Sequence, residues 1–471
     1  MKQKLHQLLL GVLTAVLLLS SAPITVVAEE TEPATWPDPP EITSAAAVVI
    51  EVSTGAILYN KAAFDALPPA STTKLMTSLL AIEQCPLSDI VTCSKDSVNS
   101  IGWDSSRIGL VAGESIDMEN ALYAILLASA NEVSYAVAEH IGGTVDNFVS
   151  MMNNRAADLG CVNTNFANPH GLDDPEHYSC PYDLALITRK AIEYTTFRRV
   201  SNSYNHHIPP TNKNVERIIA NTHPFLKKQR IYDGVFAGKT GSTSLAGNCL
   251  VTCAEKDDMT IICAIMNAPN RDTVTKDTII LLDYVFDNFS LTPLAASEAA
   301  SKNAFPVLFE DEEALISEVT SPLTVSDASL VLPKGAVYSD LTKEITLYPS
   351  TAFVAGQNVI GEVAYFFTDN YVGSAKIAFH SEEAVVIQPS PTPVPTVTPI
   401  PTVTISDSPT DPDSLAAISP SATNESTNDL RPIIIGIIVG GIVLVVGLYL
   451  VIIEIPYQKK KKSYNRKHGY R

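Results

Sequence analysis

Hydrophobic positions between residues 43 and 292 follow the period of strands, then of helices, and then of strands again. Two apolar runs in "AAAVVIEVSTGAILYNKAA" (45–63) flank Thr54 and Gly55, which predicts a β-hairpin. Helical spacing follows in four segments, at 68–83, 117–141, 142–160 and 179–194. Two strand-like runs and one last helix complete the pattern, at 249–255, 259–268 and 277–289. Because strands stand at both ends of this stretch, we expect an α/β fold whose sheet is assembled from both.

The pattern beyond this stretch outlines a second folded region and two linkers. From 303 to 385 the apolar residues alternate, as in "VIGEVAYFFTDN" (359–370), which predicts a small all-β domain. Residues 29–42 are rich in Pro, Glu and Thr and are typical of a linker. Residues 388–432 are rich in Pro, Thr and Ser, cannot bury a core, and are expected to form an extended stalk.

Apolar segments at the two ends of the chain lie outside these domains. Lys2 and Lys4 precede a leucine-rich run that ends in small residues near Ala28, the order of a secretory signal peptide over 1–28. An uncleaved N-terminal anchor is the alternative. Residues 433–453 carry no charge and are long enough for a transmembrane helix. The basic tail at 454–471 predicts a cytoplasmic C-terminus, with the chain before residue 433 held outside the cell membrane.

Charge separates the body of the protein from its two ends. The whole chain has a net charge of −19, but residues 29–458 hold 23 Lys and Arg against 51 Asp and Glu, a net charge of −28. Nucleic-acid binding depends on basic patches that hold phosphates. The acidic body therefore argues against nucleic acid as a partner.

Seven cysteines fall in the part that is predicted to be exported, and an odd number leaves at least one unpaired in a monomer. No pair has C-x-x-C spacing and none stands beside an H-x(3–5)-H, so we expect no zinc site and no other metal or cofactor. Three are predicted to be buried thiols in apolar runs: Cys249, Cys253 and Cys263. Two short disulfide loops or four free thiols fit the others equally well: Cys85 with Cys93, and Cys161 with Cys180.

The segment "PPASTTKLMTSLLAIE" (68–83) places Ser71 and Lys74 three residues apart at the start of an apolar helix. This spacing puts both side chains on one helix face. The partial positive charge of a helix N-terminus favours an oxyanion at Ser71. A lysine kept away from water loses its proton more readily and can serve as a base for the serine. By itself the motif also fits a capping serine and a surface lysine.

Two more motifs follow in the chain. The S-A-N sequence at 129–131 interrupts the helical segment 117–141 between two apolar halves, so its loop must lie in a buried setting. The K-T-G sequence at 239–241 opens the last strand-rich segment. Its glycine would let another backbone lie close to the strand, and its lysine and threonine suit a carboxylate. Taken alone, each motif fits an ordinary turn as well.

In this order the three motifs resemble the active-site set of penicillin-binding proteins and serine β-lactamases. Longer stretches narrow the resemblance to low-molecular-mass penicillin-binding proteins of the serine-type D-alanyl-D-alanine carboxypeptidase family: "PPASTTKLMTSLLAIE", "LLASANEVSYAVAEHIGG", "NFANPHGLDDPEHYS" and "GVFAGKTGSTSLAGNCLV". The resemblance implies a β-lactamase-like catalytic domain over 43–292, with an antiparallel sheet flanked by helices and a helical subdomain. More weakly, it implies a β-rich C-terminal domain over 303–385. The implied substrate is a peptidoglycan stem peptide that ends in D-Ala-D-Ala, and β-lactams are the implied inhibitors.

The resemblance also implies roles for the residues of the first two motifs. Ser71 would attack the carbonyl between the two D-alanines, and Lys74 would take its proton. Ser129 would pass a proton to the departing D-alanine, while Asn131 would hold an amide of the substrate. Water would then release the acyl-enzyme.

The third motif would bind the substrate. Lys239 and Thr240, beside Gly241, would anchor its terminal carboxylate. The backbone N–H groups of Ser71 and Ser242 would form the oxyanion hole. His170, in "NPHGLDD" (168–174), is interpreted as structural, because none of these steps needs a histidine.

Other functions remain open at this point. A DD-endopeptidase or a serine β-lactamase would use the same serine. The Glu before a Leu-Asn pair that marks class A β-lactamases is absent, however, since Glu176, Glu193 and Glu216 have other neighbours. A non-catalytic receptor for penicillin or cell wall would need a partner protein, because the tail behind the predicted span is too short for a signalling domain.

Overall fold

The computed structural model describes residues 34–102, 104–294, 323–348 and 352–386. The predicted signal peptide, stalk, transmembrane helix and cytoplasmic tail lie outside these residues. Across the described ranges, no helix is both long and apolar enough to cross a membrane.

The first part of the chain is built on a five-stranded antiparallel sheet with the strand order β2-β1-β9-β8-β7. Its strands are β1 (Ala46–Glu51), β2 (Ile57–Lys61), β7 (Val235–Thr243), β8 (Gly247–Lys256) and β9 (Met259–Ala268). β1 and β2 form the predicted hairpin, and β1 also pairs with β9, far along the chain. The prediction of an α/β fold with a sheet assembled from both ends of the segment is confirmed.

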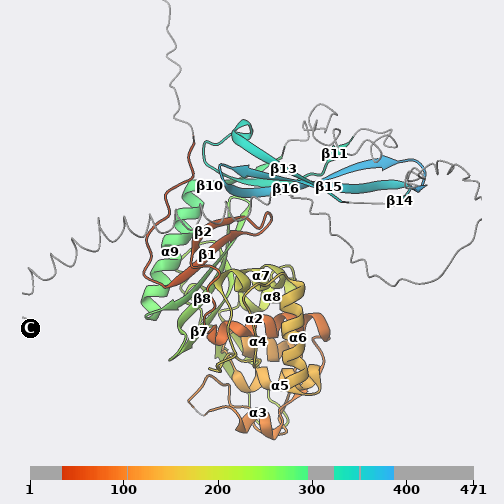
Figure 1. The fold of residues 1–471 in the computed structure, drawn as a ribbon. Coiled ribbons are helices and arrows are strands. Elements are labelled where there is room, and N and C mark those ends of the chain that lie inside the picture. The colour runs from red at the N-terminus through yellow and green to blue at the C-terminus, as the bar shows by residue number, and fades with distance from the viewer. Residues whose placement is uncertain (1–33, 103, 295–322, 349–351, 387–471) are drawn as a thin grey trace, which may run out of the picture. The chain divides into compact units, whose positions relative to one another are not determined.

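Helices cover both faces of this sheet (Figure 1) because alternate strand residues are apolar on both sides. On β1, Val48 and Ile50 pack into a cluster with the helices of the middle of the chain. Ala47 and Val49 point the other way and pack with α9 (Arg271–Asn288). The sheet is therefore the central layer between two apolar cores.

The larger core contains six helices, preceded by the 3-10 turn η1 (Ala70–Thr73). They are α2 (Lys74–Gln84), α4 (Met118–Leu126), α5 (Asn131–Gly142), α6 (Val145–Asp158), α7 (Pro181–Ala191) and α8 (Thr195–Ser201). The predicted break in segment 117–141 separates α4 from α5. α6 begins where the Thr144 side chain accepts from the Asn147 N–H, and Gly160 beyond its end has φ +80°.

Several short elements have no counterpart in the hydrophobic pattern. They are β3 (Ile90–Thr92), α3 (Lys95–Asn99), β4 (Ser115–Asp117), β5 (Asn205–Ile208), β6 (Arg217–Ala220) and η2 (Pro224–Leu226). β3 pairs with β4, and β5 pairs with β6. Strands this short do not contain enough residues for an alternating pattern to be recognised.

The described residues after α9 form strands and one 3-10 turn, which confirms the predicted all-β character of this region. Its elements are β10 (Phe289–Pro293), β11 (Thr324–Val325), β12 (Ser329–Pro333), η4 (Tyr338–Asp340), β13 (Leu341–Leu347), β14 (Ala352–Phe353), β15 (Gly356–Phe367), β16 (Asn370–Ser381) and β17 (Val385–Val386). A four-stranded sheet has the order β11-β16-β15-β13, while β10 pairs with β12 and β14 with β17. Val363, Tyr365 and Ile377 belong to its separate apolar core.

All seven cysteines are free thiols in the structure, so neither short disulfide loop is formed. Cys249, Cys253 and Cys263 are buried in β8 and β9, as their apolar surroundings predicted. Burial raises the pKa of the Cys249 thiol to about 11, which keeps it in the neutral form.

Candidate active site

Each of the three predicted motifs contributes residues to the wall of one cavity of about 270 Å³, namely Ser71, Ser129, Thr240 and Gly241. Ser71 lies in η1 and Lys74 begins α2, with 2.9 Å between the serine Oγ and the lysine Nζ. Asn131 begins α5, and its Oδ1 lies 2.6 Å from Lys74 Nζ. Across the cavity, Lys239 of β7 donates from Nζ to Ser129 Oγ at 3.0 Å. The motifs therefore form two serine–lysine pairs.

Lys74 is completely buried. Its Nζ contacts three oxygens, namely Ser71 Oγ, Asn131 Oδ1 and the backbone carbonyl of His170. The amide and carbonyl oxygens can only accept hydrogen bonds, whereas a serine hydroxyl can also donate. A neutral amine would use its two N–H groups on these two acceptors and turn its lone pair toward the Ser71 hydroxyl. The contacts of Lys74 therefore suit a base for Ser71.

The electrostatic surroundings also favour a neutral amine at this position. Burial is the main cause that lowers the pKa of Lys74 well below its ordinary value, and the nearby Lys239 adds to it, while Glu132 opposes it. Burial also lowers the pKa of Lys239, to about 7. Lys239 donates a second hydrogen bond to the backbone carbonyl of Thr240 at 2.8 Å, so two oxygens fix its position.

Two of the seven non-glycine residues with positive φ in the described part of the chain lie at this site. Ala70, directly before the candidate nucleophile, has φ +47°, and Ser129 has φ +59°. Non-glycine residues rarely adopt such left-handed conformations, which cost of order 1–3 kcal/mol each. The surrounding contacts must therefore hold both serines in place.

Two glycines, one in the loop before α7 and one in β7, allow their backbones to approach Ala70 and Ser71. Gly171 has φ +83°, and a Cβ there would lie 1.9 Å from the backbone oxygen of Ala70. A Cβ on Gly241 of β7 would lie 3.1 Å from the Ser71 backbone nitrogen. The missing side chain of Gly241 brings the backbone of β7 beside the candidate nucleophile, and the next residue, Ser242, lines the same cavity. This is the arrangement that an oxyanion hole from two backbone N–H groups requires.

A buried histidine that the sequence analysis did not single out holds the turn before Ser71. The Ala167 N–H donates to His177 Nδ1 at 2.9 Å, so the His177 proton is on Nε2, which lies 2.7 Å from Thr73 Oγ1. Thr73 Oγ1 then donates to the strained Ala70 carbonyl at 2.8 Å. Burial lowers the pKa of His177 to about 4, so this chain of hydrogen bonds is intact at neutral pH.

His170 is buried and contributes its backbone carbonyl to Lys74, and burial lowers the pKa of its own side chain to about 3. A neutral imidazole adds no positive charge beside the buried Lys74 amine. These contacts fit the structural role predicted for this residue.

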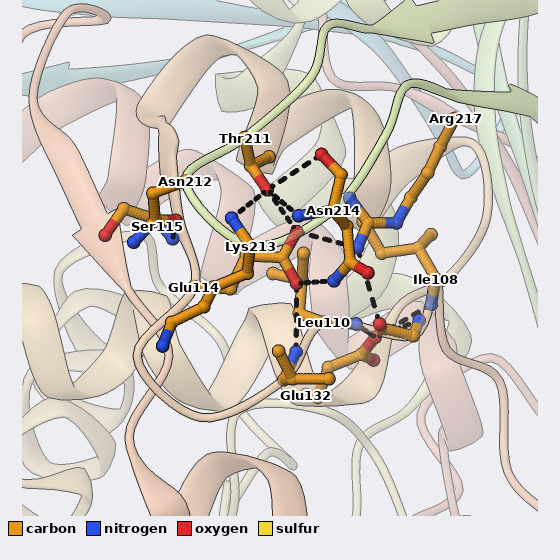
Figure 2. A network of polar contacts seen from close by, with 12 residues as sticks. Ile108, Leu110, Glu114, Ser115, Glu132, Thr211, Asn212, Lys213, Asn214 and Arg217 are labelled. Atoms are coloured by element: carbon orange, nitrogen blue, oxygen red, sulfur yellow. Dashed lines mark hydrogen bonds and ion pairs between the residues drawn. The ribbon is translucent and has the colours of Figure 1, made fainter.

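A buried carboxylate next to Asn131 fixes the loop that borders the cavity. Glu132 Oε1 accepts from the backbone N–H groups of Ile108, Gly109 and Leu110, at 2.8, 2.9 and 3.4 Å (Figure 2). Two residues earlier in the same loop, Ser106 lines the cavity and accepts at its carbonyl from the Asn131 N–H at 2.9 Å. Glu132 thus links the S-A-N motif to one wall of the site.

A second buried carboxylate, Glu114, extends this polar network to the β5–β6 hairpin (Figure 2). It accepts from the Thr211 hydroxyl, the Asn214 amide and the Arg217 guanidinium, each at 2.7 Å. Burial alone would raise the pKa of Glu114, but these donors, with the Val111 N–H, lower it below its ordinary value. The carboxylate remains charged and joins the cavity loop to the hairpin.

The other residues of the cavity wall come from β7, β8, α9 and the segment around η2. Thr240, Gly241 and Ser242 line the cavity, as the K-T-G motif predicted. Arg271, an exposed residue at the start of α9, also lines it, and no motif in the sequence pointed to this residue. An arginine can bind a carboxylate with two parallel hydrogen bonds. Only its place in the fold distinguishes Arg271 from other surface arginines.

Comparison with known proteins gives a family match over the same region. Residues 33–270 match the family described as D-alanyl-D-alanine carboxypeptidase. The D-alanyl-D-alanine carboxypeptidase DacF of Bacillus subtilis is 32% identical over 306 residues, which cover 64% of this chain and 75% of that protein. The D-alanyl-D-alanine carboxypeptidase DacA of Haemophilus influenzae is 30% identical over 358 residues, which cover 72% and 85% of the two chains.

Solved structures show the same fold. The crystal structure of penicillin binding protein 5 from Haemophilus influenzae superposes with a TM-score of 0.59 at 27% sequence identity. The superposition covers 74% of this chain and 99% of that one. It therefore extends beyond the residues matched by the family.

Replacing Glu132 by alanine should lower the free energy of unfolding by roughly 2–4 kcal/mol, because three buried N–H groups would lose a charged acceptor. Urea denaturation of the purified protein measures this loss. Glu216 is a matched control, an exposed acid that contacts His207 Nε2 at 2.8 Å, and Glu216→Ala should cost less than about 1 kcal/mol. Equal losses in the two variants would contradict the anchoring role of Glu132.

Proposed function

The chain belongs to the D-alanyl-D-alanine carboxypeptidase family, and we propose that Ser71 is the nucleophile through which it acts. The protein is a serine-type peptidase that removes the terminal D-alanine from the stem peptides of peptidoglycan. The observation that carries the assignment of Ser71 is the position of the buried Lys74 amine, between two oxygens that only accept and one hydroxyl.

In the first step Lys74 accepts the Ser71 proton while Oγ attacks the carbonyl between the two D-alanines. The new C–O bond places a negative charge on the carbonyl oxygen, which the backbone N–H groups of Ser71 and Ser242 stabilise. The close contact of Gly241 with the Ser71 backbone supports this pairing. Because the Asn131 amide oxygen accepts from Lys74, we assign the amide nitrogen of Asn131 to a carbonyl of the substrate.

In the second step the C–N bond breaks and the departing D-alanine amine takes a proton. We assign this transfer to Ser129, whose hydroxyl Lys239 holds at 3.0 Å. With its pKa lowered to about 7, Lys239 can return a proton to Ser129 near neutral pH. Water then attacks the Ser71 ester, and its released proton replaces the one that Lys239 gave up through Ser129. Lys74 returns its proton to Ser71 Oγ, which restores the hydroxyl.

The terminal carboxylate of the substrate needs a cation that it can reach. Lys239 is 1% exposed and already holds two oxygens, whereas Arg271 and Lys227 are exposed cations in the wall of the same cavity. Of these two, only arginine can bind a carboxylate with two parallel hydrogen bonds. We therefore propose that Arg271 and Thr240 bind the carboxylate directly. The buried Lys239 contributes its positive charge without contacting the carboxylate, and it acts mainly through its hydrogen bond to Ser129.

The substrate lies in the cell wall, so the enzyme must be exported. We propose that residues 1–28 direct export, that 433–453 anchor the protein in the cell membrane, and that 388–432 separate the enzyme from the bilayer. This proposal rests on the order of charged, apolar and Pro-rich segments in the sequence.

Labelled penicillin should form a covalent adduct with Ser71, because a β-lactam presents a strained amide and a carboxylate in place of D-Ala-D-Ala. Ser71→Ala should abolish the label and leave the melting temperature unchanged, as fluorescence after electrophoresis and peptide mass mapping would reveal. Ser106, in the same cavity, is the matched control, and Ser106→Ala should retain the label. An adduct on another serine would overturn the assignment.

Arg271→Ala should slow hydrolysis of a peptide with a free C-terminal carboxylate about tenfold to a hundredfold, the equivalent of a lost charge-assisted hydrogen bond of ~1.5–3 kcal/mol. On the same peptide amidated at its C-terminus the loss should be small. Lys239→Ala should slow both peptides, because Ser129 loses its partner. Rates of D-alanine or D-alaninamide release test both expectations. If Lys239→Ala slowed only the peptide with the free carboxylate and Arg271→Ala slowed neither peptide, Lys239 rather than Arg271 would be the residue that binds the carboxylate.

Deleting 433–471 should release active enzyme into the medium, and the mature N-terminus should be Glu29. Membrane fractionation and N-terminal mass analysis of the full-length and shortened proteins measure this. Full-length Ser71→Ala, which keeps the predicted span, should stay with the membrane. A shortened protein that remains in the membrane fraction would show that another segment provides the anchor.

A further inference from the structure

One group of potential metal ligands lies away from the active site. Within the described residues, a single set of three His, Cys, Asp or Glu side chains has all its donor atoms within 4.8 Å of one another, and it consists of Cys85, Asp89 and His140. His140 Nε2 and Asp89 Oδ2 are 3.6 Å apart. Nitrogen and oxygen ligands on a tetrahedral zinc ion are separated by roughly 3.3 Å, given zinc–ligand distances of about 2.0–2.1 Å. The pair thus already has nearly the required spacing.

The backbone around these ligands is fixed, while their side chains can adjust. The Asp89 N–H donates to the Pro86 carbonyl at 3.1 Å, and the Asp89 carbonyl accepts from the Met118 N–H at 2.8 Å. Cys85 directly follows α2, and His140 lies in the last turn of α5. The side chains of His140 and Asp89 are 29% and 37% exposed. A cation can enter from solvent, and small rotations bring the thiol within coordination distance.

The chemistry of the three donors favours one kind of ion. A thiolate, an imidazole and a carboxylate match Zn²⁺, whereas Mg²⁺ and Ca²⁺ prefer oxygen ligands alone. We propose that Cys85, Asp89 and His140 form a zinc-binding site in which water completes a tetrahedral shell. On binding, the Cys85 proton passes to solvent, and the two anionic ligands balance the charge of the ion.

The place of the site in the fold suggests what the ion would do. α2 and α5 carry Lys74 and Asn131 at their first residues, roughly 14–16 Å from the proposed site along each helix. A bound ion would connect the opposite ends of these two helices. Zinc would thereby stabilise the scaffold of the active site without contacting the substrate.

Titration of the full-length, reduced protein with Co²⁺, a coloured substitute for Zn²⁺, tests the proposal. One equivalent should give a saturable thiolate-to-cobalt charge-transfer band, and Zn²⁺ should displace it. Saturating Zn²⁺ should raise the melting temperature by roughly 2–5 °C. Cys85→Ser and His140→Gln should each lose the band and the shift. Penicillin labelling at Ser71 checks that each variant is folded.

Matched variants separate this site from general binding to an acidic surface. Cys161 is another half-buried thiol and His207 another histidine paired with an acid, so Cys161→Ser and His207→Gln should retain the band and the shift. Should Cys85→Ser fail to fold, Asp89→Asn provides the second test and should weaken Co²⁺ binding at least tenfold. Binding without a charge-transfer band, or a band that persists in folded Cys85→Ser, would overturn the proposal.

Discussion

The active site depends on the burial of one amine, that of Lys74. In water a lysine ammonium keeps its proton at neutral pH, so it cannot take one from a serine. Removing all exposed surface from Lys74 makes its charge costly, and the second buried lysine, Lys239, adds repulsion. Four parts of the fold contribute to this burial: α2 carries the lysine, α5 brings Asn131, the segment before α7 brings the His170 carbonyl, and β7 brings Lys239. A change in any of these parts would alter the basicity of the amine as well as the shape of the cavity.

Precise placement of the two serines has an energetic cost that the rest of the domain must offset. Ala70 and Ser129 hold left-handed backbone conformations, and nothing in their own side chains favours such conformations. Hydrogen bonds that run from His177 through Thr73 hold Ala70. The Glu132 carboxylate holds the neighbouring loop, whose Ser106 carbonyl binds the Asn131 N–H close to Ser129. Because these partners are buried, water does not compete for them. The left-handed conformations of Ala70 and Ser129 therefore depend on the polar groups buried behind them.

Features of the fold and site that depend on neighbouring residues could be predicted from the sequence, whereas features that depend on contacts between distant residues could not. The hairpin at Thr54 and Gly55, the long helices and the break between α4 and α5 follow from local periodicity and turn chemistry, and the structure confirms them. Two of the three motifs lie at element boundaries, Ser71 and Lys74 at the start of α2 and Ser129 to Asn131 between α4 and α5, whereas Lys239 to Gly241 lie inside β7. Arg271 could not be distinguished in this way, because only folding brings the start of α9 to the cavity. Spacing along the chain could not show that Cys85 and His140 lie near each other, because folding brings them together from distant points in the chain.

The position of β7 at the end of the sheet explains how a peptide can reach the site. Among the described strands β7 pairs with β8 alone, and along its other side the turn η1 approaches at Gly241. An open strand edge accepts the backbone of an extended peptide, since its N–H and C=O groups are already aligned. A peptide on this edge would meet Thr240 along the strand and Ser71 where η1 crosses it. A Cβ at position 241 would push η1 away from β7, so glycine sets the distance between this strand edge and the Ser71 hydroxyl. In the proposed mechanism, substrate binding and nucleophile placement are thus linked through the close approach of Gly241 to η1.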